Sequence, residues 1–290
     1  MYKKYVSIRN LSETIRRNFY KIPHDIDFVV GIPRSGMLAG SIIAELLNRP
    51  LIDIDSYAAG CDGTGGFRLR YMGNVPVYKK ALVVDDTVWG GKTKLIAREK
   101  LKSRPDVDYI FLAVYLEGPG EAAVDIWLDD LRGFTDGFNS PVLYEWNIFH
   151  HNESTMEHCI YDMDGVLCVN PPDERDTYAY ESYIRNAIPL FAPTTKIGVI
   201  QTYRLEKYRD VTEKWLSDNH VLYGELVMFG AGTWAERHDS GIDPASYKGR
   251  FYRDNAGMTL FVESSDYEAR RINMISGKPV FCVETNNMYI

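Results

Sequence analysis

Short apolar runs alternate with longer segments of helical spacing along the first half of the chain. The runs, at 28–32, 51–54, 81–84 and 109–115, are typical of buried strands. Between them, residues 10–20, 37–47 and 93–101 carry apolar side chains at helical intervals. Strands that alternate with helices predict a parallel sheet joined by crossover helices.

The same alternation begins again after a polar stretch at 150–155. The second set of apolar runs lies at 159–161, 197–200, 226–229, 259–262 and 279–283. We therefore predict an α/β protein with two Rossmann-like domains, each built on a mostly parallel sheet. The predicted boundaries are residues 1–152 and 153–290.

Composition narrows the class of protein. Of the 290 residues, 45% are hydrophobic and 25% charged, which is typical of a globular chain. The net charge of -7 disfavours a nucleic-acid partner. The sequence has no apolar run of bilayer-spanning length, and the N-terminal segment lacks the apolar core of a secretory signal. The four cysteines lack metal-ligand spacing, so we expect reduced thiols in a cytoplasmic protein, and leave a homo-oligomer open.

The segment 83–93, VVDDTVWGGKT, joins an apolar strand to a glycine-bearing turn and a helix. Turn amides at a helix N-terminus bind anions, and glycine allows a ligand to approach the backbone closely. Asp85 and Asp86 follow the strand, where carboxylates can accept hydrogen bonds from sugar hydroxyls. The pattern predicts a site for a phosphorylated sugar. An ordinary turn with a capping carboxylate is the alternative.

This segment resembles the motif that binds phosphoribosyl pyrophosphate (PRPP) in type I phosphoribosyltransferases. The resemblance implies a PRPP site and the type I phosphoribosyltransferase fold for residues 1–152. The PRPP-binding residues that it implies are Asp85, Asp86, Thr87, Gly90, Gly91, Lys92 and Thr93. Gly90 stands where the family usually has threonine, so one expected phosphate contact is missing.

A second segment, FVVGIPRSGMLAG at 28–40, resembles the pyrophosphate loop of the same family. By this resemblance Arg34, Ser35 and Gly36 bind the pyrophosphate of PRPP. The family also places a mobile loop between the two motifs, which here is 57–78. Arg68 and Arg70 are its expected anion contacts, and two solvated surface arginines are the alternative.

The segment 159–167, CIYDMDGVL, places two carboxylates at the end of a strand. Asp162 and Asp164 point the same way because strand side chains alternate with period two. A calcium loop or a simple turn is the alternative. The segment resembles the first motif of the haloacid-dehalogenase (HAD) phosphatases, which implies that Asp162 is the nucleophile, Asp164 the general acid/base, and Mg²⁺ the cofactor.

The other motifs of that superfamily follow in order. Thr202, in GVIQTY, has the position of the phosphate-binding hydroxyl, and Lys248, in YKGRFY, that of the phosphate-binding lysine. The segment 260–269, LFVESSDYEA, has the position of the acidic metal motif but lacks its usual Gly-Asp. The implied metal ligands are Asp162, Asp164, Glu263 and Asp266, with Glu268 as a further candidate. No large insertion separates the first two motifs, which implies a capless HAD fold.

Together the two motif sets imply a bifunctional enzyme with Mg²⁺ in both domains. The first domain transfers 5-phosphoribosyl from PRPP and releases pyrophosphate, and the second removes the 5-phosphate. The arrangement is similar to the PRPP-dependent ribofuranosyltransferase and phosphatase pairs of bacterial surface-glycan synthesis, which implies a glycan or lipid-linked glycan acceptor. The alternatives are a nucleobase phosphoribosyltransferase with nucleotide phosphatase activity, and a PRPP-sensing regulator.

Overall fold

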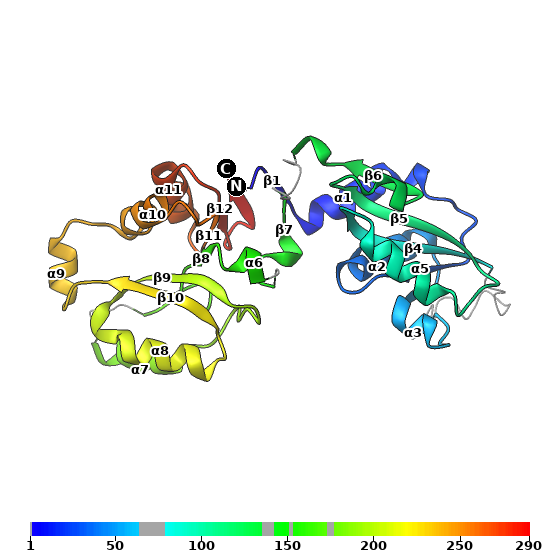
Figure 1. Ribbon diagram of the computed structural model, residues 1–290. Coiled ribbons are helices and arrows are strands. Elements are labelled where there is room, and N and C mark those ends of the chain that lie inside the picture. Colours follow the sequence, from blue (N-terminus) through cyan, green and yellow to red (C-terminus); the bar gives the residue numbers. More distant parts are fainter. Residues whose placement is uncertain (1, 64–78, 135–141, 151–152, 173–176) are drawn as a thin grey trace. The chain divides into compact units, whose positions relative to one another are not determined.

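The computed structural model describes residues 2–63, 79–134, 142–150, 153–172 and 177–290. The chain forms two compact units, one of residues 6–142 and one of residues 1–5 with 143–290 (Figure 1). Each unit is built on a mostly parallel sheet with helices on both faces, so the predicted α/β class is confirmed. Of the helices in the described ranges, none is long and apolar enough to cross a bilayer.

The unit of residues 6–142 contains a parallel sheet with the strand order β3-β2-β4-β5-β6 among its described residues. The strands are β2 (Phe28–Gly31), β3 (Leu51–Asp53), β4 (Lys80–Val88), β5 (Asp108–Leu116) and β6 (Ile126–Asp130). The helices are α1 (Ile8–Arg17), α2 (Ser35–Leu47), α3 (Ile54–Ala58) and α5 (Lys92–Leu101), with short 3-10 turns at Phe19–Lys21, Gly120–Ala123 and Arg132–Phe134.

Apolar side chains on the two faces of this sheet fix its helices. Val30, Val83 and Phe111 face α3 and α5 and form one buried cluster with them. On the other face α2 packs closely, because a Cβ added at Gly40 would lie 3.7 Å from the side chain of Val29. Apolar positions of the predicted helices therefore pack against the sheet.

Strand β4 is longer than the predicted 81–84. It continues through the acidic pair to Val88 because β5 pairs with it along its whole length, with Asp85 opposite Ala113 and Thr87 opposite Tyr115. The expectation that the strand ends before Asp85 is therefore wrong. The two carboxylates lie on the strand itself, and the turn that follows begins at Trp89.

The unit of residues 1–5 and 143–290 has a six-stranded sheet in its described part, with the order β10-β9-β8-β11-β12-β13. The strands are β8 (Cys159–Tyr161), β9 (Ile197–Leu205), β10 (Tyr223–Phe229), β11 (Leu260–Glu263), β12 (Val280–Cys282) and β13 (Asn287–Tyr289). All pairs are parallel except β12 with β13. Strands β1 (Lys4–Val6) and β7 (Val142–Tyr144) pair separately.

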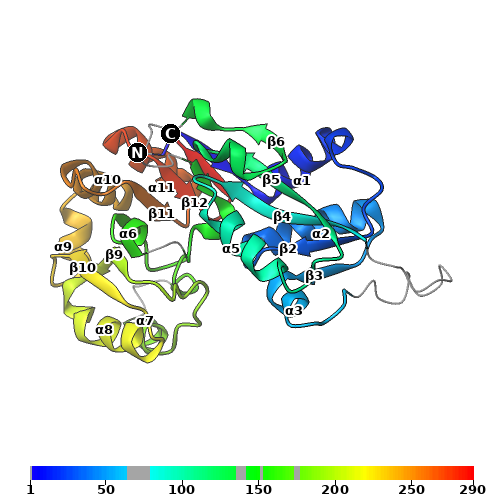
Figure 2. The same ribbon diagram turned by 45° about the vertical axis from the view of Figure 1, so that its right-hand side comes forward.

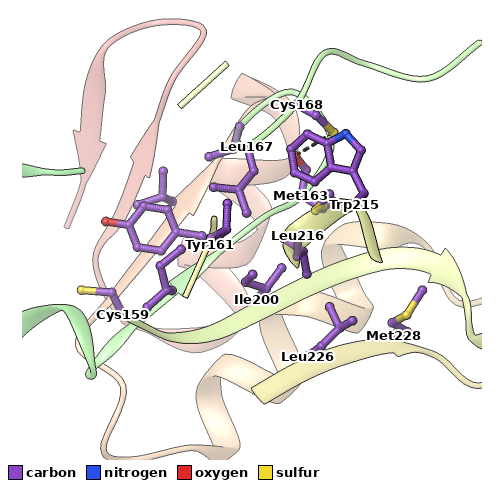
Figure 3. Close-up of a cluster of buried hydrophobic side chains, with 14 of the residues drawn as sticks. Cys159, Tyr161, Met163, Leu167, Cys168, Ile200, Trp215, Leu216, Leu226 and Met228 are labelled. Carbon is purple, nitrogen blue, oxygen red and sulfur yellow. Dashed lines mark hydrogen bonds between the residues drawn. The ribbon is translucent and has the colours of Figure 1, made fainter. Parts of the chain in front are cut away.

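The helices of this unit are α6 (Glu153–Met156), α7 (Thr177–Asn186), α8 (Arg209–Asp218), α9 (Trp234–Asp239), α10 (Pro244–Asp254) and α11 (Asp266–Ser276), with 3-10 turns at Glu145–Asn147 and Glu206–Tyr208. Helices α7 and α8 lie on one face of the sheet, and α10 and α11 on the other (Figures 1 and 2). Figure 3 shows the first face, where Tyr161 and Ile200 of the strands meet Trp215 and Leu216 of α8.

The first residues of the chain pack within this second unit. Tyr2 belongs to the same buried cluster as Leu143, Ile148 and Met156. The sequence placed the domain seam at 152/153, whereas the compact units divide at 142/143. Residues 143–149 carry several apolar side chains, and two of them, Leu143 and Ile148, pack in the core of the second unit.

Candidate active sites

A pocket of about 350 Å³ lies where β4 leads into α5. Six of the residues predicted to bind PRPP line it: Asp85, Thr87, Gly90, Gly91, Lys92 and Thr93. Val83, Phe111 and Leu112 contribute apolar wall. The pocket therefore combines a carboxyl group of strand β4, a glycine-bearing turn and the first residues of a helix around one space.

Gly91 has the backbone conformation that starts α5. Its φ is 78°, in the left-handed region, and a Cβ at this position would lie 2.3 Å from the Cβ of Ala123. Gly90 has no such requirement, since a Cβ there would meet nothing within 4 Å. The backbone conformation and the close approach of Ala123 therefore both require glycine at position 91.

The acidic pair is closely coupled. The backbone N–H of Asp86 donates to Oδ1 of Asp85 at 3.0 Å. Burial, followed by the charge of Asp86, raises the pKa of Asp85 to about 8. Hydrogen-bond donors from a ligand, such as the hydroxyls of a sugar, would stabilise the ionised form of this buried carboxyl group.

Lys94 is a pocket residue that the sequence reasoning missed. Its side chain lines the pocket but is only 6% exposed. Its Nζ lies 3.7 Å from Oδ1 of Asp125 and 4.9 Å from the ring centroid of Phe111. Burial lowers its pKa. In sequence, a lysine near the start of a helix gives no sign of being buried. The available signal was its spacing, because Lys94 lies three residues before Ala97 on the buried face of the helix.

The predicted pyrophosphate loop lies beside the acidic pair but outside the lining of this pocket. The Pro33–Arg34 peptide bond is cis, and α2 begins at Ser35. A Cβ at Gly36 would lie 2.6 Å from the carbonyl oxygen of Val84 and 3.1 Å from Cα of Asp85, so α2 abuts β4 at the acidic pair. The predicted anion contacts Arg68 and Arg70 lie outside the described residues.

The second site centres on Lys248 of α10. Its Nζ donates to Oδ2 of Asp162 at 2.9 Å, Oε2 of Glu263 at 2.8 Å and Oε2 of Glu268 at 2.9 Å. Lys248, Asp162 and Glu263 are all buried. The structure thus brings together the predicted nucleophile, the predicted lysine and two candidates for the acidic motif.

The charges of this cluster do not balance. One ammonium faces three carboxylates, which leaves a formal charge of -2 when all are ionised. Burial, and next the charge of Glu263, raise the pKa of Asp162 well above its usual range. Burial lowers the pKa of Lys248, but the three carboxylates raise it by more, so the net shift is upward. A further cation would relieve the repulsion among the carboxylates.

Asp164 takes part in a different network. Arg204, which the sequence reasoning missed, donates to both of its carboxylate oxygens, with Nε 3.0 Å from Oδ2. The hydroxyl of Tyr183 donates to Oδ1 at 2.6 Å, and Sγ of Cys168 lies 3.5 Å from the same atom. Burial raises the pKa of Asp164, but Arg204 and these donors lower it by more, so the net shift is downward.

Gly165, which closes the DxDG motif, needs to be glycine. Its φ is 79°, and a Cβ there would lie 2.5 Å from the Cβ of Ser264. Strand β9 extends beyond the predicted run at 197–200, through Thr202, to Leu205. Thr202 is fully buried, and its hydroxyl accepts from the N–H of Arg204 at 3.2 Å.

The acidic segment that follows β11 divides between two surroundings. Asp266 contacts Arg270 and Tyr289 rather than Lys248, with Oδ2 2.8 Å from Nε of Arg270. Glu268 reaches the Lys248 cluster from the first turn of α11. Asp266, a predicted metal ligand, therefore lies outside the Lys248 cluster, whereas Glu268, the further candidate, belongs to it.

Within the residues that the structure describes, no set of three or more His, Cys, Asp or Glu side chains is arranged to hold a metal ion. The carboxylates of Asp162, Glu263 and Glu268 instead converge on Lys248. Their oxygen donors and excess negative charge are nevertheless the chemistry that Mg²⁺ prefers.

Only solved structures are similar to this chain, and the similarity is low. No family model matches the chain, and no curated protein matches it. Solved structures similar to part of it include orotate phosphoribosyltransferase from Aeropyrum pernix, at 17% identity and a TM-score of 0.32, covering 43% of this chain and 70% of that one. Xanthine-guanine-hypoxanthine phosphoribosyltransferase from Helicobacter pylori matches at 15% identity and a TM-score of 0.35, covering 50% and 93%.

A chain of the Pnkp1/Rnl/Hen1 complex is similar over nearly the full length. The identity is 13% and the TM-score 0.35, with 98% of this chain and 97% of that one covered. The α/β class of both units rests on the strand order and parallel pairing described above.

Proposed function

We propose that the chain is a bifunctional enzyme that transfers 5-phosphoribosyl from PRPP to an acceptor and then removes the 5-phosphate. The transferase half is supported by the pocket in which six motif residues surround one space at the start of α5. The phosphatase half is supported by the convergence of Asp162, Glu263 and Glu268 on Lys248. The second observation carries the proposal, because its parts come from three separate segments of the sequence.

In the transfer step the bond between the anomeric carbon and pyrophosphate breaks, and a bond to an acceptor oxygen forms as the acceptor loses its proton. The amides of the turn at Gly90 and Gly91 would hold a phosphate group. The carboxyl group of Asp85 would accept from ribose hydroxyls, and the positive charge that develops at the ring would favour its ionised form. Exclusion of water by the apolar wall would protect the reactive centre from hydrolysis.

In the phosphatase step a carboxylate oxygen of Asp162 bonds to phosphorus while the ester bond breaks, and the leaving oxygen takes a proton from the carboxyl group of Asp164. Water then cleaves the aspartyl-phosphate and releases inorganic phosphate. Lys248 would hold Asp162 and neutralise charge on the phosphoryl group. The ionised form of Asp164 that Arg204 favours suits the second step, in which a base takes a proton from water.

The proposal includes Mg²⁺ because carboxylate oxygens are the ligands that this ion prefers. In the second unit, Asp162 and Glu263 would hold it, and it would offset the charge of -2 and draw electron density from the phosphoryl group. In the first unit it would neutralise charge on the pyrophosphate of PRPP. The acceptor is proposed to be a glycan or lipid-linked glycan hydroxyl, since removal of the 5-phosphate would work against a salvage enzyme whose product is a nucleotide.

The test is incubation of the protein with PRPP, Mg²⁺ and a panel of glycan acceptors and free nucleobases, with mass spectrometry of all products. A pentose added to a glycan, with release of both pyrophosphate and phosphate, supports the full proposal. Nucleoside or nucleotide formation from a base favours the nucleobase alternative. Binding of PRPP without any transfer favours the regulator.

A further inference from the structure

Strand register places Gln201 beside the predicted nucleophile. Ile160 of β8 pairs with Val199 of β9, and both face α10 and α11. The next pair, Tyr161 with Ile200, faces α7 and α8. Because side chains alternate along parallel strands, the following residues, Asp162 and Gln201, share the α10 face on adjacent strands.

The row continues across the sheet. Phe261 of β11 pairs with Ile160 and faces α10, so Glu263, two residues on, faces the same way. Lys248 of α10 confirms the direction, since its ammonium contacts both Asp162 and Glu263. Gln201 therefore occupies the next position in a row whose other two members are the acidic groups of the candidate site.

The side chain of Gln201 is fully buried, and neither Nε2 nor Oε1 has a hydrogen-bond partner among the described residues. Its neighbours are satisfied: Oδ1 of Asp162 accepts from the N–H of Met163 at 2.8 Å, and Oδ2 from Lys248. A buried amide without hydrogen-bond partners destabilises the folded protein, so a residue of this kind needs a specific explanation.

We propose that Gln201 binds the phosphoryl group that Asp162 receives, with its Nε2 donating to a phosphoryl oxygen. The inference rests on the proposed phosphatase function and extends it to a residue outside the motifs. Lys248 brings charge to the group, whereas the amide brings a neutral donor of fixed direction. Gln201 forms no covalent bond, and the transfer to Asp162 and the hydrolysis by water are those given above.

The chain contains a single glutamine, so selective ¹⁵N labelling of glutamine side chains gives one amide group to follow. The probe is orthovanadate, an oxyanion of phosphate shape, added with Mg²⁺ to the full-length protein. We expect the ¹H and ¹⁵N signals of the Gln201 side chain to shift on addition. In parallel, thermal unfolding reports whether orthovanadate binds at all.

The matched variant is Gln201→Met, which keeps the length of the side chain and removes the amide. We expect it to unfold at the same temperature or higher without ligand, and to hydrolyse p-nitrophenyl phosphate roughly ten- to a hundredfold more slowly, as loss of one hydrogen bond to a charged group implies. The stabilisation by orthovanadate should also diminish.

Two negative outcomes are distinct. If orthovanadate stabilises the protein while the Gln201 signals stay fixed and Gln201→Met keeps full activity, the amide only holds a buried water, and the inference fails alone. If the wild-type protein neither binds orthovanadate nor hydrolyses any phosphate ester, the proposed phosphatase fails and the inference with it.

Discussion

Arg204 forms a bidentate ion pair with the carboxylate of Asp164, with Nε 3.0 Å from Oδ2 and Nη2 donating to Oδ1. The guanidinium is fully buried and the carboxylate nearly so, with side-chain exposures of 0% and 17%. Arg204 lies two residues after Thr202 on β9, and its Nη1 lies 3.4 Å from Oγ1 of Thr212 on α8. The second carboxylate of the DxDG motif is thus fixed by β9.

Removal of the guanidinium should be costly. In Arg204→Met the free energy of unfolding should fall by about 3–5 kcal/mol, because Asp164 is left buried without its partner. Chemical denaturation measures this change. Arg209→Met is the control, since Arg209 is a third exposed and pairs with Glu206 at the surface, and should cost less than about 1 kcal/mol. Equal losses in the two variants would contradict a structural role for the Arg204 pair.

Two neighbouring glycines give a matched test of the turn before α5. Gly91→Ala should lower the free energy of unfolding by about 2 kcal/mol or more, because alanine disfavours a left-handed backbone and its Cβ would overlap Ala123. It should also weaken PRPP binding, measured by calorimetry. Gly90→Ala, with open space around its Cβ, should change stability little. A larger loss at Gly90 would refute this account of the turn.

The raised pKa of Asp85 predicts a pH dependence. The folded carboxyl titrates at about 8, whereas the unfolded one titrates near 3.9. Between these values the folded state holds a proton that the unfolded state has lost, so stability falls as pH rises from about 4 to 8. Asp85→Asn removes this slope and should gain on the wild type toward pH 8 in denaturation series. Asp106→Asn, at an exposed position and measured over the same pH range, is the control.

The two acidic residues at the start of α11 should differ in importance. Glu268→Gln should lower Mg²⁺-dependent hydrolysis of p-nitrophenyl phosphate by about tenfold or more, because it removes a carboxylate that contacts Lys248. Asp266→Asn should lower it by less, since Asp266 pairs with Arg270. Steady-state kinetics at several Mg²⁺ concentrations decides. A larger loss of activity in Asp266→Asn than in Glu268→Gln would instead support the predicted Asp266 as the metal ligand.

The two proposed activities should separate in one variant. Asp162→Asn removes the nucleophile, so phosphate release should fall by roughly a thousandfold or more, as loss of a covalent catalyst implies. Transfer from PRPP should continue, and the product should accumulate with its 5-phosphate, as seen by mass spectrometry. An unphosphorylated product at the wild-type rate would exclude Asp162 as the nucleophile.

Much of the fold could be predicted because buried parallel strands are short, apolar and separated by helices. The core strands β2, β4, β5, β8 and β9 were found in this way. Strand ends were less predictable, since pairing with a long neighbour carries β4 through two carboxylates. Residues such as Tyr183 and Arg204 were missed because their contacts join segments far apart in sequence. An arginine inside an apolar strand was the available signal, since a buried charge needs a partner.

The unit that holds residues 1–5 is interrupted by the whole of residues 6–142. Its first strand, β1, pairs with β7 across that interval. On the ribosome, residues 6–142 can fold as soon as they emerge, whereas β1 must wait for β7 to be synthesised. Closure of so long an interval is slow relative to local pairing. We therefore expect the unit of residues 6–142 to fold first, before the unit of residues 1–5 and 143–290 is complete.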